Sequence, residues 1–205
     1  MFTTGLPSVF TIQKQSSSPK QFALTSDHDG SSIVSIVRQS GDSVDISANG
    51  PPARRLATIK RDLTNTKADV TIFEQASETP VTQFRIEYKS LGDHRASHSF
   101  STNSPNTEEK TNFEWRNDGA GWQLLRVSAP NSVLEVVATG ALNAGTLEPP
   151  RFELRDVSGE QSQGESWGLV AAVSWIRVWD KVQTDVIKSS NPNKDAAMAS
   201  CCIVL

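Results

Sequence analysis

Residues 167–179 read WGLVAAVSWIRVW, an apolar run that only Ser174 and Arg177 interrupt. A helix made of this run would be apolar on almost every side, so it must be enclosed by protein or lipid. The run is too short to cross a bilayer, and Arg177 lies inside it. We therefore expect a buried core helix, covering residues 165–187, rather than a membrane-spanning one.

The residues before this helix show the pattern of an all-β protein. Up to Arg155, short runs with apolar residues at every second position alternate with turn residues such as Asp27–Gly30. The clearest run is Val81–Tyr88, which has β-branched or aromatic side chains on one face. The spacing predicts about twelve strands. They are Val9–Gln13, Gln21–Leu24, Ser32–Val37, Asp42–Ile46, Arg55–Lys60, Asp69–Phe73, Val81–Tyr88, His98–Phe100, Asn112–Arg116, Trp122–Val127, Val133–Ala138 and Arg151–Leu154.

The strands and the helix together predict one architecture. About a dozen strands can close into a barrel whose interior is wider than their own inward side chains can fill. A helix that is apolar on all sides can occupy that interior. We therefore predict a mainly β fold, a closed barrel of about twelve strands that encloses a C-terminal hydrophobic helix. This domain covers residues 1–187, and residues 188–205 are predicted to be a flexible tail.

The chain ends in Cys202-Ile203-Val204-Leu205, the pattern of a C-terminal prenylation box. The final leucine favours a geranylgeranyl group on Cys202, and Cys201 is a candidate for palmitoylation. The alternatives are a hydrophobic C-terminal strand or an accidental tetrapeptide. However, residues 188–200 are poor in apolar side chains and favour a tether that a transferase can bind. One lipid gives only reversible attachment, and aspartates offset the nearby lysines. The palmitoyl group is therefore the better candidate for a second membrane signal.

Composition narrows the cellular setting. The net charge is −3, so no overall positive field favours nucleic acid. The first residues lack the pattern of a secretory signal, and two adjacent cysteines cannot build a disulfide framework. We expect a monomer that a prenyltransferase modifies. It would lie at the cytoplasmic face of the plasma membrane or an endomembrane, without a nucleic-acid partner.

A strand series followed by a hydrophobic helix resembles the tubby C-terminal-like superfold. Tubby proteins, plant LURP-one-related proteins and phospholipid scramblases share that fold, and the likeness is closest to fungal proteins of the group. The residues that carry the resemblance are Phe113–Arg116, Gly121–Arg126, Leu134–Ala138, Arg151–Leu154 and Trp167–Trp179. The resemblance implies a barrel around a central helix, and phosphoinositide binding through basic side chains on the barrel surface. The cysteine-rich and acidic calcium-binding segments of scramblases are missing, so lipid scrambling is not implied.

One basic cluster is a candidate for binding lipid headgroups. It consists of Arg54, Arg55, Lys60 and Arg61. Arginine and lysine suit phosphate groups through forked and point-charge contacts respectively. The alternative is a charged edge strand that prevents aggregation, which the nearby Asp62 and Asp69 favour.

The sequence offers no positive case for an enzyme, a metal site or a cofactor. Asp93, His94 and His98 fall in a loop and a strand, where residues four apart are not neighbours as they are on a helix. Phosphate loops, nucleophile elbows and Cys/His pairings do not occur. We therefore predict a lipid-anchored, membrane-tethered binding or adaptor module. Two alternatives stay open: an interaction protein whose prenylated tail docks into a partner, and a lipid-transfer or lipid-metabolism enzyme built on a barrel.

Overall fold

The structure is a computed structural model. It describes residues 6, 8–15, 20–39, 42–74, 79–92, 95–103, 110–117, 119, 121–127, 135–142, 149–155 and 167–190. For residues 91, 92, 95 and 187–190 it describes the backbone alone.

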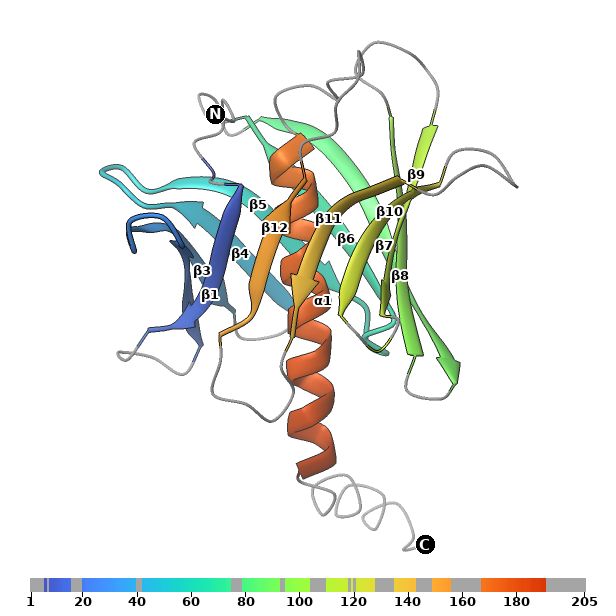
Figure 1. Cartoon of the computed structure of the whole chain (residues 1–205). Helices are drawn as coiled ribbons and strands as arrows, with labels where there is room; N and C mark the ends of the chain where they lie inside the picture. Colours follow the sequence, from blue (N-terminus) through green and yellow to red (C-terminus); the bar gives the residue numbers. More distant parts are fainter. Residues whose placement is uncertain are drawn as a thin grey trace, which may run out of the picture.

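Within the described residues, twelve antiparallel strands form a closed barrel (Figure 1). Each strand pairs with its neighbours in sequence, and β1 pairs with β12 to close the ring. The strands are β1 (Val9–Lys14), β2 (Gln21–Ser26), β3 (Ser32–Arg38), β4 (Ser43–Ala48), β5 (Arg54–Arg61), β6 (Lys67–Phe73), β7 (Pro80–Gly92), β8 (Arg95–Asn103), β9 (Lys110–Asn117), β10 (Trp122–Val127), β11 (Glu135–Ala141) and β12 (Arg151–Leu154). The predicted mainly β barrel is confirmed, and each predicted strand overlaps one of these.

The barrel wall follows from the alternation of side chains along the strands. In β6, Ala68, Val70 and Ile72 are buried, whereas Lys67 and Asp69 are exposed. Successive side chains of a strand point to opposite faces, so each strand sends an apolar row into the barrel and a polar row into solvent. Removing an inward row from water stabilises the fold by roughly 25 cal/mol for each Å² of apolar surface.

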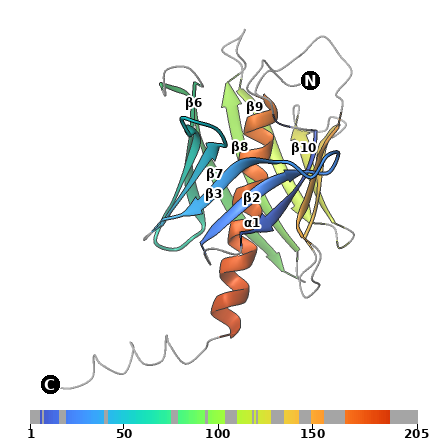
Figure 2. The same ribbon diagram turned by 90° about the vertical axis from the view of Figure 1, so that its left-hand side faces the viewer.

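The single described helix, α1 (Trp167–Ser190), runs along the inside of the barrel and emerges at its lower end (Figures 1 and 2). Every residue from Gly168 to Lys181 is buried. This confirms the predicted core helix. Within the described part of the chain, no helix combines the length and apolar character that crossing a membrane requires.

Tryptophan side chains of α1 fix the helix against the wall. The Trp175 ring lies 5.1 Å from the Trp115 ring of β9, and the Trp115 Nε1 donates a hydrogen bond of 2.9 Å to the Ser174 Oγ. Gly140 of β11 leaves the space that the Trp175 ring fills, since a Cβ at residue 140 would lie 2.4 Å from ring atoms. Trp179 meets Phe22 of β2 edge to face at 4.7 Å. The helix therefore packs against β2, near the start of the chain, and also against β9 and β11, much later in the sequence.

The helix extends beyond the predicted domain boundary at residue 187, because its described backbone continues to Ser190. The predicted lipidation box and Cys201 lie outside the described residues. Asp93 and His94, which were considered together with His98 as metal ligands, also lie outside the described residues.

Candidate functional site

The basic cluster predicted from sequence does not form one patch. Arg54 and Arg55 begin β5, whereas Lys60 and Arg61 end it. Four residues, 56–59, lie between the two pairs, and Lys60 follows Arg54 by six positions, which is roughly 20 Å along a strand. The Arg55 guanidinium lies 5.7 Å from the centre of the Phe73 ring on the outer surface. Only Lys60 and Arg61 lie near the end of the barrel where α1 emerges.

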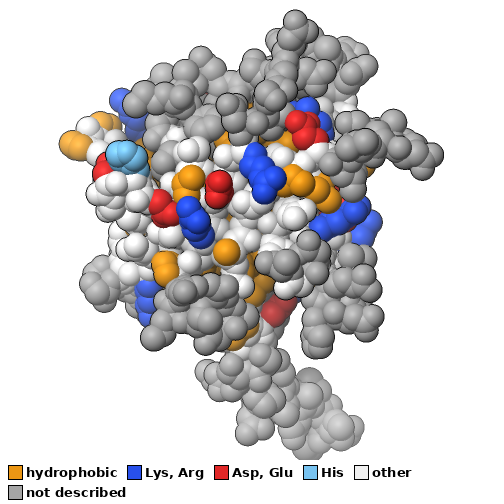
Figure 3. Space-filling model, viewed as in Figure 1, with side chains coloured by type: hydrophobic (Ala, Val, Ile, Leu, Met, Phe, Trp, Pro, Cys, Tyr) orange, Lys and Arg blue, Asp and Glu red, His pale blue; other side chains and the backbone are white. Residues whose placement is uncertain are grey.

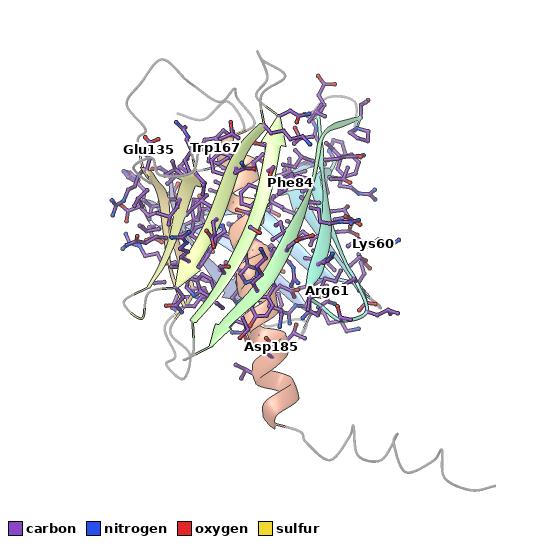
Figure 4. The ribbon with its side chains drawn as sticks, turned by 90° about the vertical axis from the view of Figure 1, so that its right-hand side faces the viewer. Lys60, Arg61, Phe84, Glu135, Trp167 and Asp185 are labelled. Carbon is purple, nitrogen blue, oxygen red and sulfur yellow. The ribbon has the colours of Figure 1, made fainter. Side chains whose placement is uncertain are left out.

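We call this end the exit mouth. Its barrel residues are Arg38, Arg61, Asn65, Tyr88 and His98, and its helix residues are 177–184. Figure 4 shows Arg61 toward this end and Asp185 on the emerging helix, with Trp167 at the opposite end.

Arg61 turns into the exit mouth although Lys60 beside it points to solvent. Arg61 follows Ile59 by two residues and therefore shares its inward face. Its Nη1 lies 3.3 Å from the Asp180 Oδ2 and 3.4 Å from the Thr184 Oγ1. This side chain ties the barrel wall to the helix.

A hollow of about 620 Å³ opens beside Arg61. Its lining residues are Asp42, Ser43, Lys60, Arg61, Asp62, Leu63 and Thr64. The lining carries two cations and two carboxylates, so its charges balance. Leu63 is 94% exposed at the tip of the β5–β6 hairpin. The hollow can therefore contact a ligand that has both charged groups and apolar surface.

The β5–β6 hairpin is built by Asp62. The Asp62 carboxylate accepts hydrogen bonds from the Thr64 hydroxyl at 2.6 Å and from the backbone N–H of Thr66 at 2.9 Å. The Thr64 bond is the largest cause of the lowered pKa of Asp62, about 2. The Asp62 carboxylate therefore stabilises the turn through these hydrogen bonds, and the turn exposes Leu63 to solvent.

The centre of the exit mouth is a buried carboxylate, Asp180, which three guanidinium groups share. The Arg38 Nε lies 2.9 Å from the Asp180 Oδ1 without the alignment of a hydrogen bond. The Arg61 Nη1 and the Arg177 Nη1 lie 3.3 Å and 3.7 Å from the Asp180 Oδ2. Arg38 also packs over the rings of Phe22 and Trp179, at 5.2 Å and 4.9 Å from their centres.

Lys181 is a further buried cation of the exit mouth. Its Nζ pairs with the Asp185 carboxylate one turn later and lies 4.3 Å from the centre of the Tyr88 ring. The face of the aromatic ring attracts the ammonium group, and this attraction is stronger where water is excluded. Lys181 is therefore held between a helix carboxylate and the wall.

His98 is a fully buried residue of the exit mouth. Its ring lies 5.2 Å from that of Tyr88 and 5.6 Å from that of Trp122, and neither ring nitrogen has a hydrogen-bond partner among the described residues. Burial, together with the positive charges of Arg177 and Lys181, lowers the pKa of His98 to about 3. At neutral pH this histidine is uncharged.

The protein is expected to lose stability in acid because of His98. The imidazole of the unfolded chain binds a proton below about pH 6.5, whereas that of the folded chain stays neutral to about 3. Unfolding therefore takes up a proton between these values, and stability falls by up to about 1.4 kcal/mol for each pH unit as the pH drops. His98→Phe should flatten this slope in urea unfolding measured from pH 7.5 to 4.5.

His28→Gln is the matched control, because His28 lies in the exposed turn after β2. It should keep the slope of the unchanged chain. If His98→Phe retains that slope as well, another group is responsible for the acid sensitivity.

Sequence reasoning missed the Asp180 cluster, although part of its signal was present. Arg177, Asp180 and Lys181 are spaced so that they share a helix face with the buried run. An ionisable group inside an enclosed helix needs a partner. The partners Arg38 and Asn65 are more than a hundred residues away in sequence, and no short motif indicates them.

The described residues on the face shown in Figure 3 carry charges of both signs, and their lysine, arginine, aspartate and glutamate side chains are interspersed. On the wall, Arg85 pairs with Asp69 at 2.6 Å, and Lys67 pairs with Glu87 at 3.3 Å. The exit mouth is therefore the best candidate site among the described residues.

No family model, curated protein or solved structure matches the chain. The resemblance to the tubby C-terminal-like superfold therefore stays a prediction.

Proposed function

We propose that the chain is a membrane-tethered binding module, anchored through a geranylgeranyl group on Cys202. The observation that carries the proposal is the Cys202–Leu205 box, which follows a helix that leaves the barrel. The proposal requires Leu205 to bear the free carboxylate of the native chain. A palmitoyl group on Cys201 would supply the second signal that stable attachment needs.

The position of α1 supports this tether. The helix ends at Ser190 outside the exit mouth (Figure 2). The residues from there to Leu205 span at most about 50 Å when fully extended. A membrane that holds Cys202 would therefore lie close to the exit mouth, on the cytoplasmic side of the plasma membrane or an endomembrane.

The filled interior favours binding through the outer surface. Trp175, Arg177 and Ile176 of α1 are fully buried inside the barrel, where a carrier would hold its ligand. This favours a binding module over the alternative of a lipid-transfer or lipid-metabolism enzyme. Phospholipid headgroups, phosphoinositides included, are the proposed ligand class. Lys60 and Arg61 at the hollow are better placed for a membrane near the exit mouth than Arg54 and Arg55.

The Cys202→Ser variant should lose its membrane attachment. A serine cannot be prenylated, and palmitoylation of such proteins usually follows the first lipid at a membrane. In cell fractionation we expect the variant to move from the membrane pellet to the soluble fraction. Cys201→Ser is the matched control, with weaker attachment and an intact prenyl group. Mass spectrometry of the native C-terminal peptide identifies both the terminus and the lipid.

Equal membrane recovery of the unchanged chain and Cys202→Ser would contradict the proposal. A soluble chain that carries the geranylgeranyl group and co-purifies with one protein would favour the other alternative, a tail that docks into a partner's lipid-binding pocket. The Leu205→Ser variant should carry a farnesyl group instead, which the mass of the peptide reports.

A further inference from the structure

Leu63 is the most exposed large hydrophobic side chain among the described residues. It is 94% exposed, whereas the next two, Val81 and Val186, are 52% and 47% exposed. Single exposed leucines are common on protein surfaces, so exposure alone indicates no function. Leu63 differs by its place, since it lies between β5 and β6 beside the exit mouth, at the end of the barrel from which α1 emerges (Figure 4).

Hydrogen bonds of the β5–β6 turn hold Leu63 in this position. The backbone N–H of Asp62 donates to the Lys67 carbonyl at 3.0 Å, and the backbone N–H of Lys67 donates to the Asp62 carboxylate at 3.1 Å. The Asn65 carbonyl accepts a hydrogen bond of 2.9 Å from the Arg177 Nη2, which attaches the turn to α1. A side chain presented by such a fixed turn loses little further freedom when it binds.

The charges around Leu63 are of both signs. Two cations and two carboxylates line the hollow beside it. Beyond the turn, Lys67 pairs with Glu87 at 3.3 Å. Attraction to anionic lipid is therefore not the main force at this hairpin. The apolar surface of Leu63 remains, and its removal from water is favourable and depends little on the screening of charges by salt.

We propose that Leu63, at the tip of the β5–β6 hairpin, inserts into the apolar layer of the membrane to which Cys202 tethers the chain. This inference rests on the proposed function, because the tether brings the hairpin to the lipid surface. Cys202 follows Ser190 by twelve positions, which span at most about 43 Å. A bilayer that holds Cys202 is therefore within reach of the hairpin.

Insertion of Leu63 fixes the orientation of the barrel. Since α1 continues past Arg61 to Ser190, the barrel must tilt toward the β5–β6 hairpin for Leu63 to reach the bilayer (Figure 4). One side chain enters the apolar layer, and the polar neighbours Asp62 and Thr64 stay among the hydrated headgroups. The lipid anchor and the hairpin would then hold the barrel at two points.

Methyl nuclear magnetic resonance of the full chain on phosphatidylcholine nanodiscs tests the insertion. The chain with Cys201→Ser is coupled through Cys202 to a maleimide-bearing lipid, which requires no prenyltransferase and so separates this test from that of the proposed function. A nitroxide on the lipid acyl chains should broaden the Leu63 methyl signals. Val81 is the matched control, because it lies near the start of β7, at the end of the barrel opposite the β5–β6 turn, and its signals should stay sharp.

Partitioning into phosphatidylcholine vesicles measures the contribution of Leu63. The chain with Cys201→Ser is alkylated chemically with one geranylgeranyl group at Cys202, so that its attachment is reversible. Adding Leu63→Ser should weaken partitioning roughly tenfold at both low and high sodium chloride. Val81→Ser should partition as the parent chain does. Both variants should keep the parent's Tm, since both side chains are exposed.

Leu63 signals that stay as sharp as those of Val81 on the nanodisc would overturn the inference and leave the tether of the proposed function intact. So would equal broadening of both residues, or equal partitioning of Leu63→Ser and its parent chain. A native chain without a prenyl group would contradict the proposed function, whereas the nanodisc result would still report whether the hairpin inserts.

Discussion

Trp175→Asp is expected to abolish folding of the barrel. The Trp175 side chain is fully buried, in contact with Trp115 and against the backbone at Gly140. Removing a buried tryptophan costs about 3–5 kcal/mol. An unpaired carboxylate at the same place costs several kcal/mol more. The sum is comparable with the whole stability of a domain, roughly 5–15 kcal/mol.

The variant should appear in the insoluble fraction, or should lack the near-ultraviolet circular dichroism of packed aromatic rings. Val186→Asp is the matched control on the same helix, because Val186 is 47% exposed and lies beyond the buried part of α1. It should remain soluble with Tm within a few degrees of the unchanged chain. A Trp175→Asp protein that unfolds cooperatively at the original Tm would show that the barrel does not need its central helix.

Gly140→Ala should be the most damaging single-methyl change in the barrel. The added Cβ would lie 2.4 Å from two ring atoms of Trp175 and 2.8 Å from a third. The ring is rigid and enclosed, so either the helix or β11 must move. Overpacking of a core costs about 1–3 kcal/mol and occasionally more. We expect the upper end or beyond, measured as the free energy of unfolding in urea.

A double-variant cycle separates this clash from a general weakening of β11. Trp175→Phe shortens the ring and should itself cost stability through the cavity it leaves. In that background Gly140→Ala should cost much less, with a coupling energy of about 1–3 kcal/mol. Thr139→Ala, at the preceding residue on the outer face, should behave alike in both backgrounds. An equal cost of Gly140→Ala in both would show that the ring is not the cause.

Local patterns were sufficient to predict the barrel. Alternation in Val81–Tyr88 predicted the core of β7, and the apolar run from Trp167 predicted α1. The strand ends were less accurate, since β7 continues to Gly92, where the alternating pattern is absent. Pairing with β8 stabilises that extension. The sequence of a single strand does not reveal which residues of another strand it pairs with.

The site was harder to predict because it depends on register and on distant partners. Arg61 was grouped with Lys60 as a surface cation, although its place two residues after Ile59 indicates the inward face. A β-bulge at Leu56 also shifts the alternation within β5, since Ser47 pairs with Arg55 while Ile46 pairs with Ala57. The meeting of Arg38 with Asp180 follows from closure of the whole barrel around the helix.

The order of the elements along the chain has a consequence for biosynthesis. The part that fills the interior, α1, is translated after all twelve strands. A nascent chain on the ribosome therefore exposes the inward rows of every strand before their packing partner exists. Such surfaces invite aggregation, which chaperones suppress in cells. The barrel should complete its folding only after α1 has emerged from the ribosome, with chaperones holding the unfilled strands until then.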